Sequence, residues 1–152
     1  MKARTVDVHE AIGRLQRLAE LFHQRRAQLA QGAGLTEAQW EVLERIASEH
    51  FMPSLFARHR ESSAPAVSRI IRQLLRKKLI TVSVSDTDGR QRRYQLTARG
   101  QKTLDALRAT RRRAIDAVWM HLDQRALAAF TQFSGELITR LEAYDRDGKE
   151  DS

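Results

Sequence analysis

The chain of 152 residues is long enough for one domain with a substantial core, and its 27 Lys and Arg against 19 Asp and Glu give a net charge of +8. It contains no cysteine, which excludes disulfides, thiolate metal sites and cysteine nucleophiles. We find neither a signal peptide nor an apolar run of ~18 residues, so we expect a cytoplasmic protein without a membrane span. The basic balance favours a polyanionic partner, such as nucleic acid or an acidic membrane surface.

The positive charge is concentrated in the middle of the chain. Residues 55–113 hold 16 of the 27 basic residues and only 4 of the 19 acidic ones, a net of +12. The remaining 11 basic and 15 acidic residues give the rest of the chain a net of −4. A block of one charge usually marks an interaction region, and chance clustering on solvated faces is the alternative.

The first two expected elements are helices. Apolar residues recur at helical spacing over residues 6–30, and the glycine-rich residues 31–34 end that helix. A second helix begins at Thr36 and runs to about residue 50. Thr36 forms an S/T-x-x-E/Q capping box with Gln39.

Two further helices follow. Pro53 suits the first turn of a short helix that ends near residue 60, and Ser62-Ser63 can cap a longer one that reaches about residue 78. At 100° per residue, one face of this fourth helix is apolar. That face consists of Val67, Ile70, Ile71, Leu74 and Leu75. The opposite face has small residues first and cations later: Ser62, Pro65, Ala66, Arg69, Arg72, Gln73 and Arg76. Such a helix end can approach a phosphate-bearing surface closely.

A β-ribbon comes next. Residues 80–85 alternate, and we expect Ile80, Val82 and Val84 to face inward. Residues 86–89 form the turn, and residues 90–96 return with arginines at positions 90, 92 and 93. Two caps, Thr97 and Asp123, then start two long helices. The order α-α-α-α-β-β-α-α predicts a mainly α protein with a winged helix-turn-helix.

Several motifs occur in an order that resembles the MarR (multiple antibiotic resistance regulator) family. They are Leu35-Thr36, Gln39-Trp40, Leu43, Phe56-Ala57, Val67-Ser68-Arg69, Asp88-Gly89-Arg90, Leu96-Thr97 and Gly100. The resemblance runs from about residue 6 to 145. It implies a single regulator domain over 1–152, with dimerisation helices at 6–30 and 98–145 and a DNA-binding lobe at 36–97. It further implies a homodimer that represses transcription.

The resemblance also implies the DNA-binding residues. Arg90 takes the place of the wing-tip arginine that reaches the minor groove, and Asp88 that of the neighbour that orders the wing. We expect Arg92 and Arg93 to contact backbone phosphates. The alternative is a surface hairpin in which Asp86 and Asp88 pair with these arginines. The full candidate set is Ser62, Ser63, Pro65, Ala66, Ser68, Arg69, Arg72, Gln73, Asp88, Arg90 and Arg92. Ser68 lies at the side of the helix, so base readout, a phosphate contact and an intrahelical role all stay open.

The turn before the fourth helix departs from the family pattern. The family has an apolar-Gly-apolar sequence there, whereas this chain has Arg60-Glu61-Ser62. We therefore predict a looser turn in this protein.

The resemblance also implies a site for a small molecule. The resemblance places His23, Trp40 and Met52 near a cleft where relatives bind aromatic or anionic effectors, but Trp40 can equally be a core residue packed on Leu35. Among five histidines only Glu20-x-x-His23 has ligand spacing, so we expect no metal and no cofactor. No phosphate-binding loop or nucleophile motif occurs, and we expect no enzyme.

The sequence thus predicts a regulator that binds a pseudo-palindromic double-stranded DNA operator as a homodimer, and a repressor released by a small effector. Two alternatives stay open. One is an architectural protein that binds DNA without sequence preference. The other is an adaptor whose basic helices bind a membrane surface or a protein.

Overall fold

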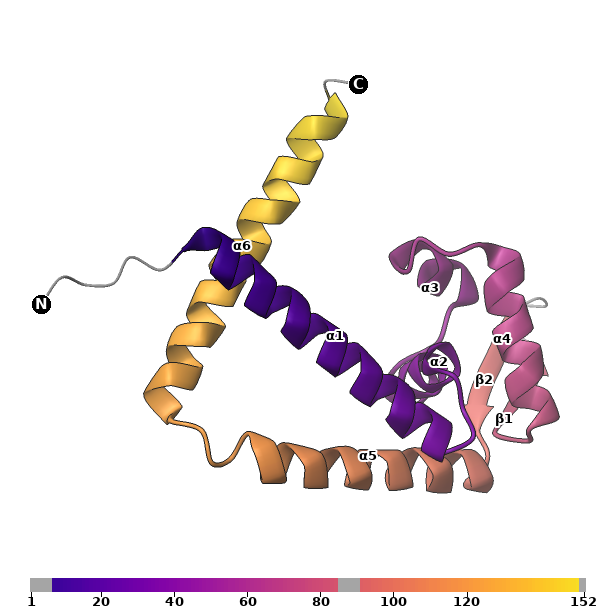
Figure 1. Cartoon of the computed structure of the whole chain (residues 1–152). Helices are drawn as coiled ribbons and strands as arrows, with labels where there is room; N and C mark the ends of the chain where they lie inside the picture. Colours follow the sequence, from indigo (N-terminus) through magenta and orange to yellow (C-terminus); the bar gives the residue numbers. More distant parts are fainter. Residues whose placement is uncertain (1–6, 85–90, 151–152) are drawn as a thin grey trace, which may run out of the picture. The chain divides into compact units, whose positions relative to one another are not determined.

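The computed structural model describes residues 7–84 and 91–150. The chain divides into two compact units, residues 1–111 and 112–152. Its elements, drawn in Figure 1, confirm the predicted mainly helical winged helix-turn-helix. They are α1 (Val8–Gly32), α2 (Glu37–Ser48), α3 (Pro53–His59), α4 (Ala64–Arg76), β1 (Ile80–Val84), β2 (Arg92–Leu96), α5 (Ala98–Val118) and α6 (Gln124–Glu150). None of the described helices is long and apolar enough to cross a membrane.

The helix starts follow the caps read from the sequence. Thr36 Oγ1 accepts the Gln39 N–H at 3.1 Å, and the Gln39 side chain accepts the Thr36 N–H at 3.1 Å, so the predicted capping box is present. Ser63 is the N-cap of α4 and accepts the Ala66 N–H at 3.2 Å. Each cap satisfies an N–H that the helix itself leaves without a partner.

The core of the first unit lies beneath α4. Val67, Ile71 and Leu74 are buried, and Ile70 and Leu75 pack against the core, which confirms the predicted inner face. Burying each of the three aliphatic side chains contributes roughly 1.5–3 kcal/mol. The other buried hydrophobics come from the neighbouring elements: Ala30, Leu35, Trp40, Val42, Leu43, Ile46, Phe51, Phe56, Ala57, Leu79, Ile80, Leu104 and Leu107.

The two strands form an antiparallel ribbon in which Ile80 pairs with Leu96, Val82 with Tyr94 and Val84 with Arg92. The prediction that Val82 and Val84 face inward is wrong, because they are 41% and 61% exposed. They share a face with the buried Ile80, since alternate strand residues point to one side. The ribbon, however, extends past the edge of the core, so this face is covered at its base and uncovered toward its tip.

An ion pair joins α2 to the first half of α5. The Arg108 guanidinium donates to both carboxylate oxygens of Glu44, at 2.6 and 3.3 Å, and the Trp40 indole N–H donates to Glu44 at 3.2 Å. Burial alone would raise the pKa of the Glu44 carboxyl, but these hydrogen bonds and the positive charges of Arg108 and Arg111 together outweigh it and hold the pKa below its ordinary value.

The base of the ribbon meets the start of α5 at a contact between backbones. Thr97 Oγ1 donates to the Lys78 carbonyl at 2.7 Å and accepts the Gly100 N–H at 3.0 Å, while the Thr97 N–H donates to the Leu79 carbonyl at 3.0 Å. A Cβ atom on Gly100 would lie 2.0 Å from the Leu79 carbonyl oxygen. Glycine is therefore required here for steric reasons, which explains its place in the Leu96-Thr97-x-x-Gly100 motif.

We predict that Gly100→Ala destabilises the protein by roughly 3 kcal/mol, because rigid backbone cannot yield to the new methyl group as a side chain would. Urea denaturation followed by circular dichroism measures this. Gly13→Ala in α1 is the matched control: nothing lies within 4 Å of its added Cβ. It should gain up to about 1 kcal/mol from helix propensity. Equal stability of Gly100→Ala and wild type would contradict the close approach.

The second unit contains the end of α5 and the whole of α6. Asp123 caps α6 by accepting the Ala126 N–H at 2.8 Å, as predicted. Much of its apolar surface is uncovered in the single chain. The exposed large hydrophobics of this unit are Ile115, Val118, Met120, Leu122, Phe130, Phe133, Ile138, Leu141 and Tyr144, and α1 in the first unit adds Val8, Ile12, Leu18, Leu21 and Phe22.

Candidate nucleic-acid interface

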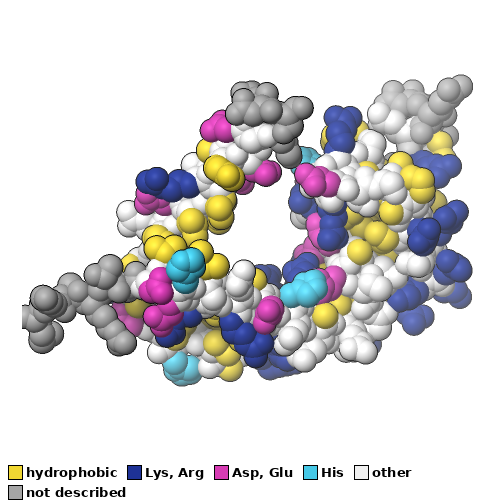
Figure 2. All heavy atoms as spheres, turned by 45° about the horizontal axis from the view of Figure 1, so that its top comes forward, with side chains coloured by type: hydrophobic (Ala, Val, Ile, Leu, Met, Phe, Trp, Pro, Cys, Tyr) yellow, Lys and Arg dark blue, Asp and Glu magenta, His cyan; other side chains and the backbone are white. Residues whose placement is uncertain are grey.

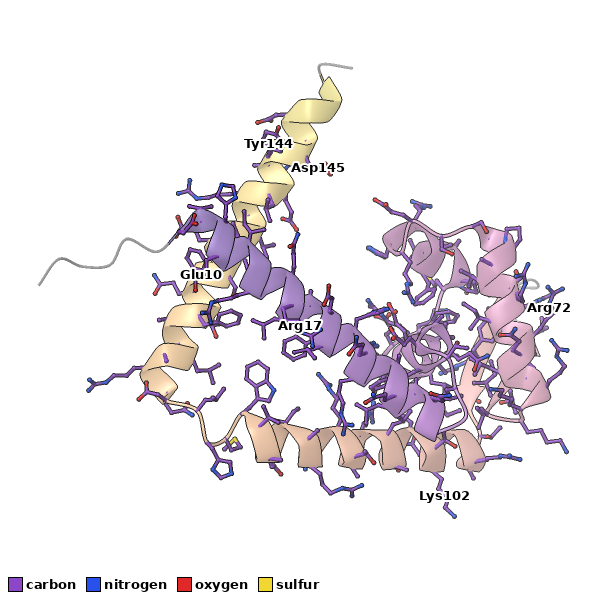
Figure 3. The ribbon with its side chains drawn as sticks, viewed as in Figure 1. Glu10, Arg17, Arg72, Lys102, Tyr144 and Asp145 are labelled. Carbon is purple, nitrogen blue, oxygen red and sulfur yellow. The ribbon has the colours of Figure 1, made fainter. Side chains whose placement is uncertain are left out.

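The outward face of α4 carries the helix residues predicted to bind DNA. Ser62, Ser63, Pro65 and Ser68 are exposed, and Ala66 is half-buried. Arg69 and Arg72 are exposed further along the helix, as is Arg76. Figure 3 shows the labelled Arg72 pointing away from the lobe on the outer side of α4. One helix side therefore presents small residues near its N-terminus and guanidinium groups beyond them.

The arginines of this face have no carboxylate partner in the described part of the chain. The cations that form ion pairs there include Arg14, Arg17, His23, Arg26, Arg45, Arg60, Arg108 and Arg140, and none of them lies on this face. In Figure 2, dark blue side chains gather along the edge of the lobe where α4 and the ribbon lie. Because no described acid pairs with these cations, their positive potential is available to an external anion.

The ribbon adds two more exposed cations. Arg92 and Arg93 are neighbours in β2, so they point to opposite faces, and both are exposed. Asp88 and Arg90 lie outside the described residues, and their roles stay predictions.

Gln73 has a role that the sequence did not reveal. It is half-buried, and its side-chain oxygen accepts an N–H from the buried Gln39 at 2.8 Å. The ammonium of Lys77 donates to Gln39 Oε1 at 3.0 Å and to the Gly34 carbonyl at 2.5 Å. The sequence indicated only that Gln39, as the last residue of the capping box, bonds Thr36. Its second partner, Gln73, lies 34 residues away in sequence, so no local pattern predicted that contact.

The atypical turn between α3 and α4 is closed by hydrogen bonds. The Glu61 N–H donates to the Arg58 carbonyl at 3.2 Å and the Ser62 N–H to the Ala57 carbonyl at 2.8 Å. Arg60 pairs with Glu41 of α2 at 2.5 Å in place of an apolar anchor. Glu61, where the family has glycine, has a φ of +50°, in the left-handed region. The missing glycine thus appears as local backbone strain in a turn that keeps its hydrogen bonds.

We predict that Glu61→Gly stabilises the protein by about 1 kcal/mol, because glycine adopts positive φ without the steric cost that a side chain incurs there. Thermal and urea denaturation measure the change. Glu49→Gly is the control, since Glu49 has a φ of −152° and should only lose stability. A stability loss in Glu61→Gly would contradict the prediction, since it would show that the relieved strain is smaller than the conformational entropy that glycine adds to the unfolded chain.

The three residues proposed for an effector are in different environments. Trp40 is 2% exposed, and the Arg26 guanidinium lies 4.4 Å from the centroid of its ring. His23 is exposed, with Nδ1 at 3.8 Å from a Glu37 carboxylate oxygen. Met52 is exposed at the start of α3. Trp40 is thus a core residue, as the alternative reading had it. Among residues 7–84 and 91–150, no group of three or more His, Asp or Glu could hold a metal ion.

Comparison with known proteins agrees with this geometry. The MarR family model matches residues 33–91, a range that contains α2, α3, α4 and β1 and ends just before β2. A solved MarR family transcription regulator has 21% identity and a TM-score of 0.77, with 90% of each chain covered. The Staphylococcus aureus MepR–DNA complex has 20% identity and a TM-score of 0.66, covering 84% of this chain and 93% of that one. Staphylococcus aureus MarR in complex with salicylate and kanamycin has 18% identity and a TM-score of 0.73, covering 88% and 91%. A search among curated proteins gave no match.

These likenesses establish the fold. With the family match over residues 33–91, they confirm the resemblance to the MarR family that the motifs indicated.

Proposed function

We propose that this chain, which resembles the MarR family, is a sequence-specific DNA-binding transcription regulator. The observation that carries the proposal is the outer face of α4, where small residues precede exposed arginines that no described carboxylate neutralises. The Staphylococcus aureus MepR of similar fold was solved as a complex with DNA, which supports it.

Each part of the interface suits a different feature of a duplex. Arg69 and Arg72 can donate paired N–H groups to guanine O6 and N7, and the Ala66 methyl suits contact with a thymine methyl in the major groove. In the first turn of α4, Pro65 has no N–H and the Ala66 N–H is held by Ser63, so Ala64 is the residue there that can offer a backbone N–H to phosphate. Arg92 and Arg93 would position the ribbon on phosphates. We assign Arg90 to the minor groove, which attracts arginine where it is narrow.

The uncovered apolar surface supports a homodimer. Large hydrophobics on α1, on α6 and between α5 and α6 stay exposed in the single chain, and patches of this kind mark association surfaces. A second copy of the chain is the partner we propose. A two-fold dimer would present two copies of α4 to half-sites ~34 Å apart, hence a pseudo-palindromic operator.

We further propose that the regulator is a repressor released by a small aromatic or anionic effector. The fold relative solved with salicylate supports this class of ligand. His23 and Met52 are the exposed residues proposed for its site. An effector that binds better to a dimer with altered spacing of the α4 helices would lower affinity for the operator.

The test starts from duplexes recovered by selection from random-sequence DNA. Binding to the recovered duplex and to a scrambled one is measured across a salt series for wild type, Arg72→Ala, Arg90→Ala and the control Arg140→Ala. Arg140 is exposed and pairs with Glu136 on α6, so its loss removes the same charge outside the interface. The specific-to-scrambled ratio is the affinity for the recovered duplex divided by the affinity for the scrambled one. We expect Arg72→Ala and Arg90→Ala to lower this ratio about fivefold or more. A lost phosphate contact alone would lower the log–log salt slope by about 0.9.

Selection that recovers no preferred sequence would favour the architectural alternative. Binding to anionic vesicles without DNA preference would favour the adaptor.

The dimer has its own test. Phe133 and Leu141 lie on one face of α6, and Gln132 and Thr139 lie on the opposite one. Phe133→Glu/Leu141→Glu should convert a dimer of 17.5 kDa chains into monomers in analytical ultracentrifugation, and should weaken binding to a full operator much more than binding to a half-site. Gln132→Glu/Thr139→Glu, with the same added charge, should leave the dimer intact. A monomeric wild type would contradict the proposal.

A further inference from the structure

Among the described residues, Gln39 is the polar residue that is buried in the core of the first unit, and 3% of its surface is exposed. Its Oε1 accepts the Thr36 N–H at 3.1 Å and the Lys77 ammonium at 3.0 Å, and its Nε2 donates to Gln73 Oε1 at 2.8 Å. Capping its own helix needs only the first of these contacts. The other two reach residues of α4 and its C-cap, across the interface between the two helices.

The contacts extend to a third element. The Lys77 ammonium also donates to the Gly34 carbonyl at 2.5 Å, in the connection between α1 and α2. One small network, made of Gly34, Thr36, Gln39, Gln73 and Lys77, therefore fixes the second half of α4 to the start of α2 and to the connection between α1 and α2. We call it the Gln39 network.

Hydrogen bonds and apolar contacts constrain a helix differently. The buried face of α4 is aliphatic, and dispersion contacts are non-directional, so they resist sliding or rotation of the helix only through side-chain shape. A buried amide loses far more when it is displaced, because each unmade hydrogen bond leaves a desolvated polar group. The Gln39 network thus fixes both the position of α4 along its own axis and its rotation about that axis.

We infer that Gln39 is a positioning residue for DNA recognition: through Gln73 and Lys77 it sets the rotation and height at which α4 presents Arg69 and Arg72. This inference rests on the proposed function. In this inference, the side-chain carbonyl of Gln73 and the ammonium of Lys77 hold α4 in place. The helical wheel, by contrast, placed Gln73 on the outward face and so predicted a contact with DNA.

The test compares binding to the selected duplex with binding to its scrambled version. Gln39→Leu keeps the approximate size of the side chain and removes every hydrogen bond of the side-chain amide. We expect its specific-to-scrambled ratio to fall about fivefold or more, the loss of one misaligned base contact, while the salt slope stays unchanged because no phosphate contact is removed. Val42→Ala is the control. Val42 is fully buried on the same helix and is purely apolar, so its truncation costs stability but should leave the ratio unchanged.

A double-mutant cycle separates positioning from direct readout by Gln73. If Gln39 and Gln73 act through their shared hydrogen bond, Gln39→Leu/Gln73→Leu loses no more discrimination than Gln39→Leu alone. Gln39→Glu keeps an acceptor for Thr36 and Lys77, and the Gln73 amide can turn to donate to it, so this variant should restore most of the ratio. All ratios are measured where circular dichroism shows each variant folded.

Lys77→Met covers the case in which Gln39→Leu does not fold. It removes two contacts of the network at its partly exposed end, and it should lower the ratio without lowering the salt slope. A slope lower by about 0.9 would instead place the Lys77 charge on a phosphate and overturn the inference. An unchanged ratio in Gln39→Leu, or an equal fall in Val42→Ala, would also overturn it. A wild type without any sequence preference would reject the proposed function itself, and this inference with it.

Discussion

The first unit depends on burial of one face of α4. An isolated helix of 13 residues is marginal in water, so α4 owes its stability to the packing of Val67, Ile71 and Leu74 on the core. The same 3.6-residue period that buries these side chains places Arg69 and Arg72 on the opposite side. The packing that folds α4 therefore also orients its cations. A substitution on the buried face that shifts the helix will shift Arg69 and Arg72 with it.

The contacts that complete this packing are polar and come from distant parts of the chain. The Gln39 network joins α4 to α2 and to the connection between α1 and α2, and the Arg60–Glu41 pair joins the turn before α4 to α2. At the other end, the backbone contact of Gly100 with Leu79 fixes the base of the ribbon on α5. Three separate constraints thus hold α4 and its neighbours, each at a place where apolar packing alone would allow movement.

The sequence predicted the features that are encoded locally. The caps at Thr36, Ser63 and Asp123 each bond the residue three positions further along the chain. The apolar spacing of α4 likewise occurs within one short stretch of sequence. The exposure of Val82 and Val84 was not predictable, because alternation tells which residues share a face and not where the core ends. The partnership of Gln39 with Gln73 and that of Arg60 with Glu41 join separate helices, so no local pattern contains them. The wing tip with Asp88 and Arg90 rests on the motif alone.

The segregation of charge along the sequence acquires a physical meaning in the structure. On the terminal helices, Arg14 pairs with Glu10, Arg17 with Glu20 and Arg140 with Glu136, each within one turn of its own helix. Such exposed pairs contribute little stability, but they cancel charge locally. The arginines of α4 and β2 have no such partner among the described residues, so their positive charge is not cancelled locally. Mutual repulsion there makes the free lobe less stable and an anionic partner more favourable, which concentrates both affinity and steering on the face that we propose reads DNA.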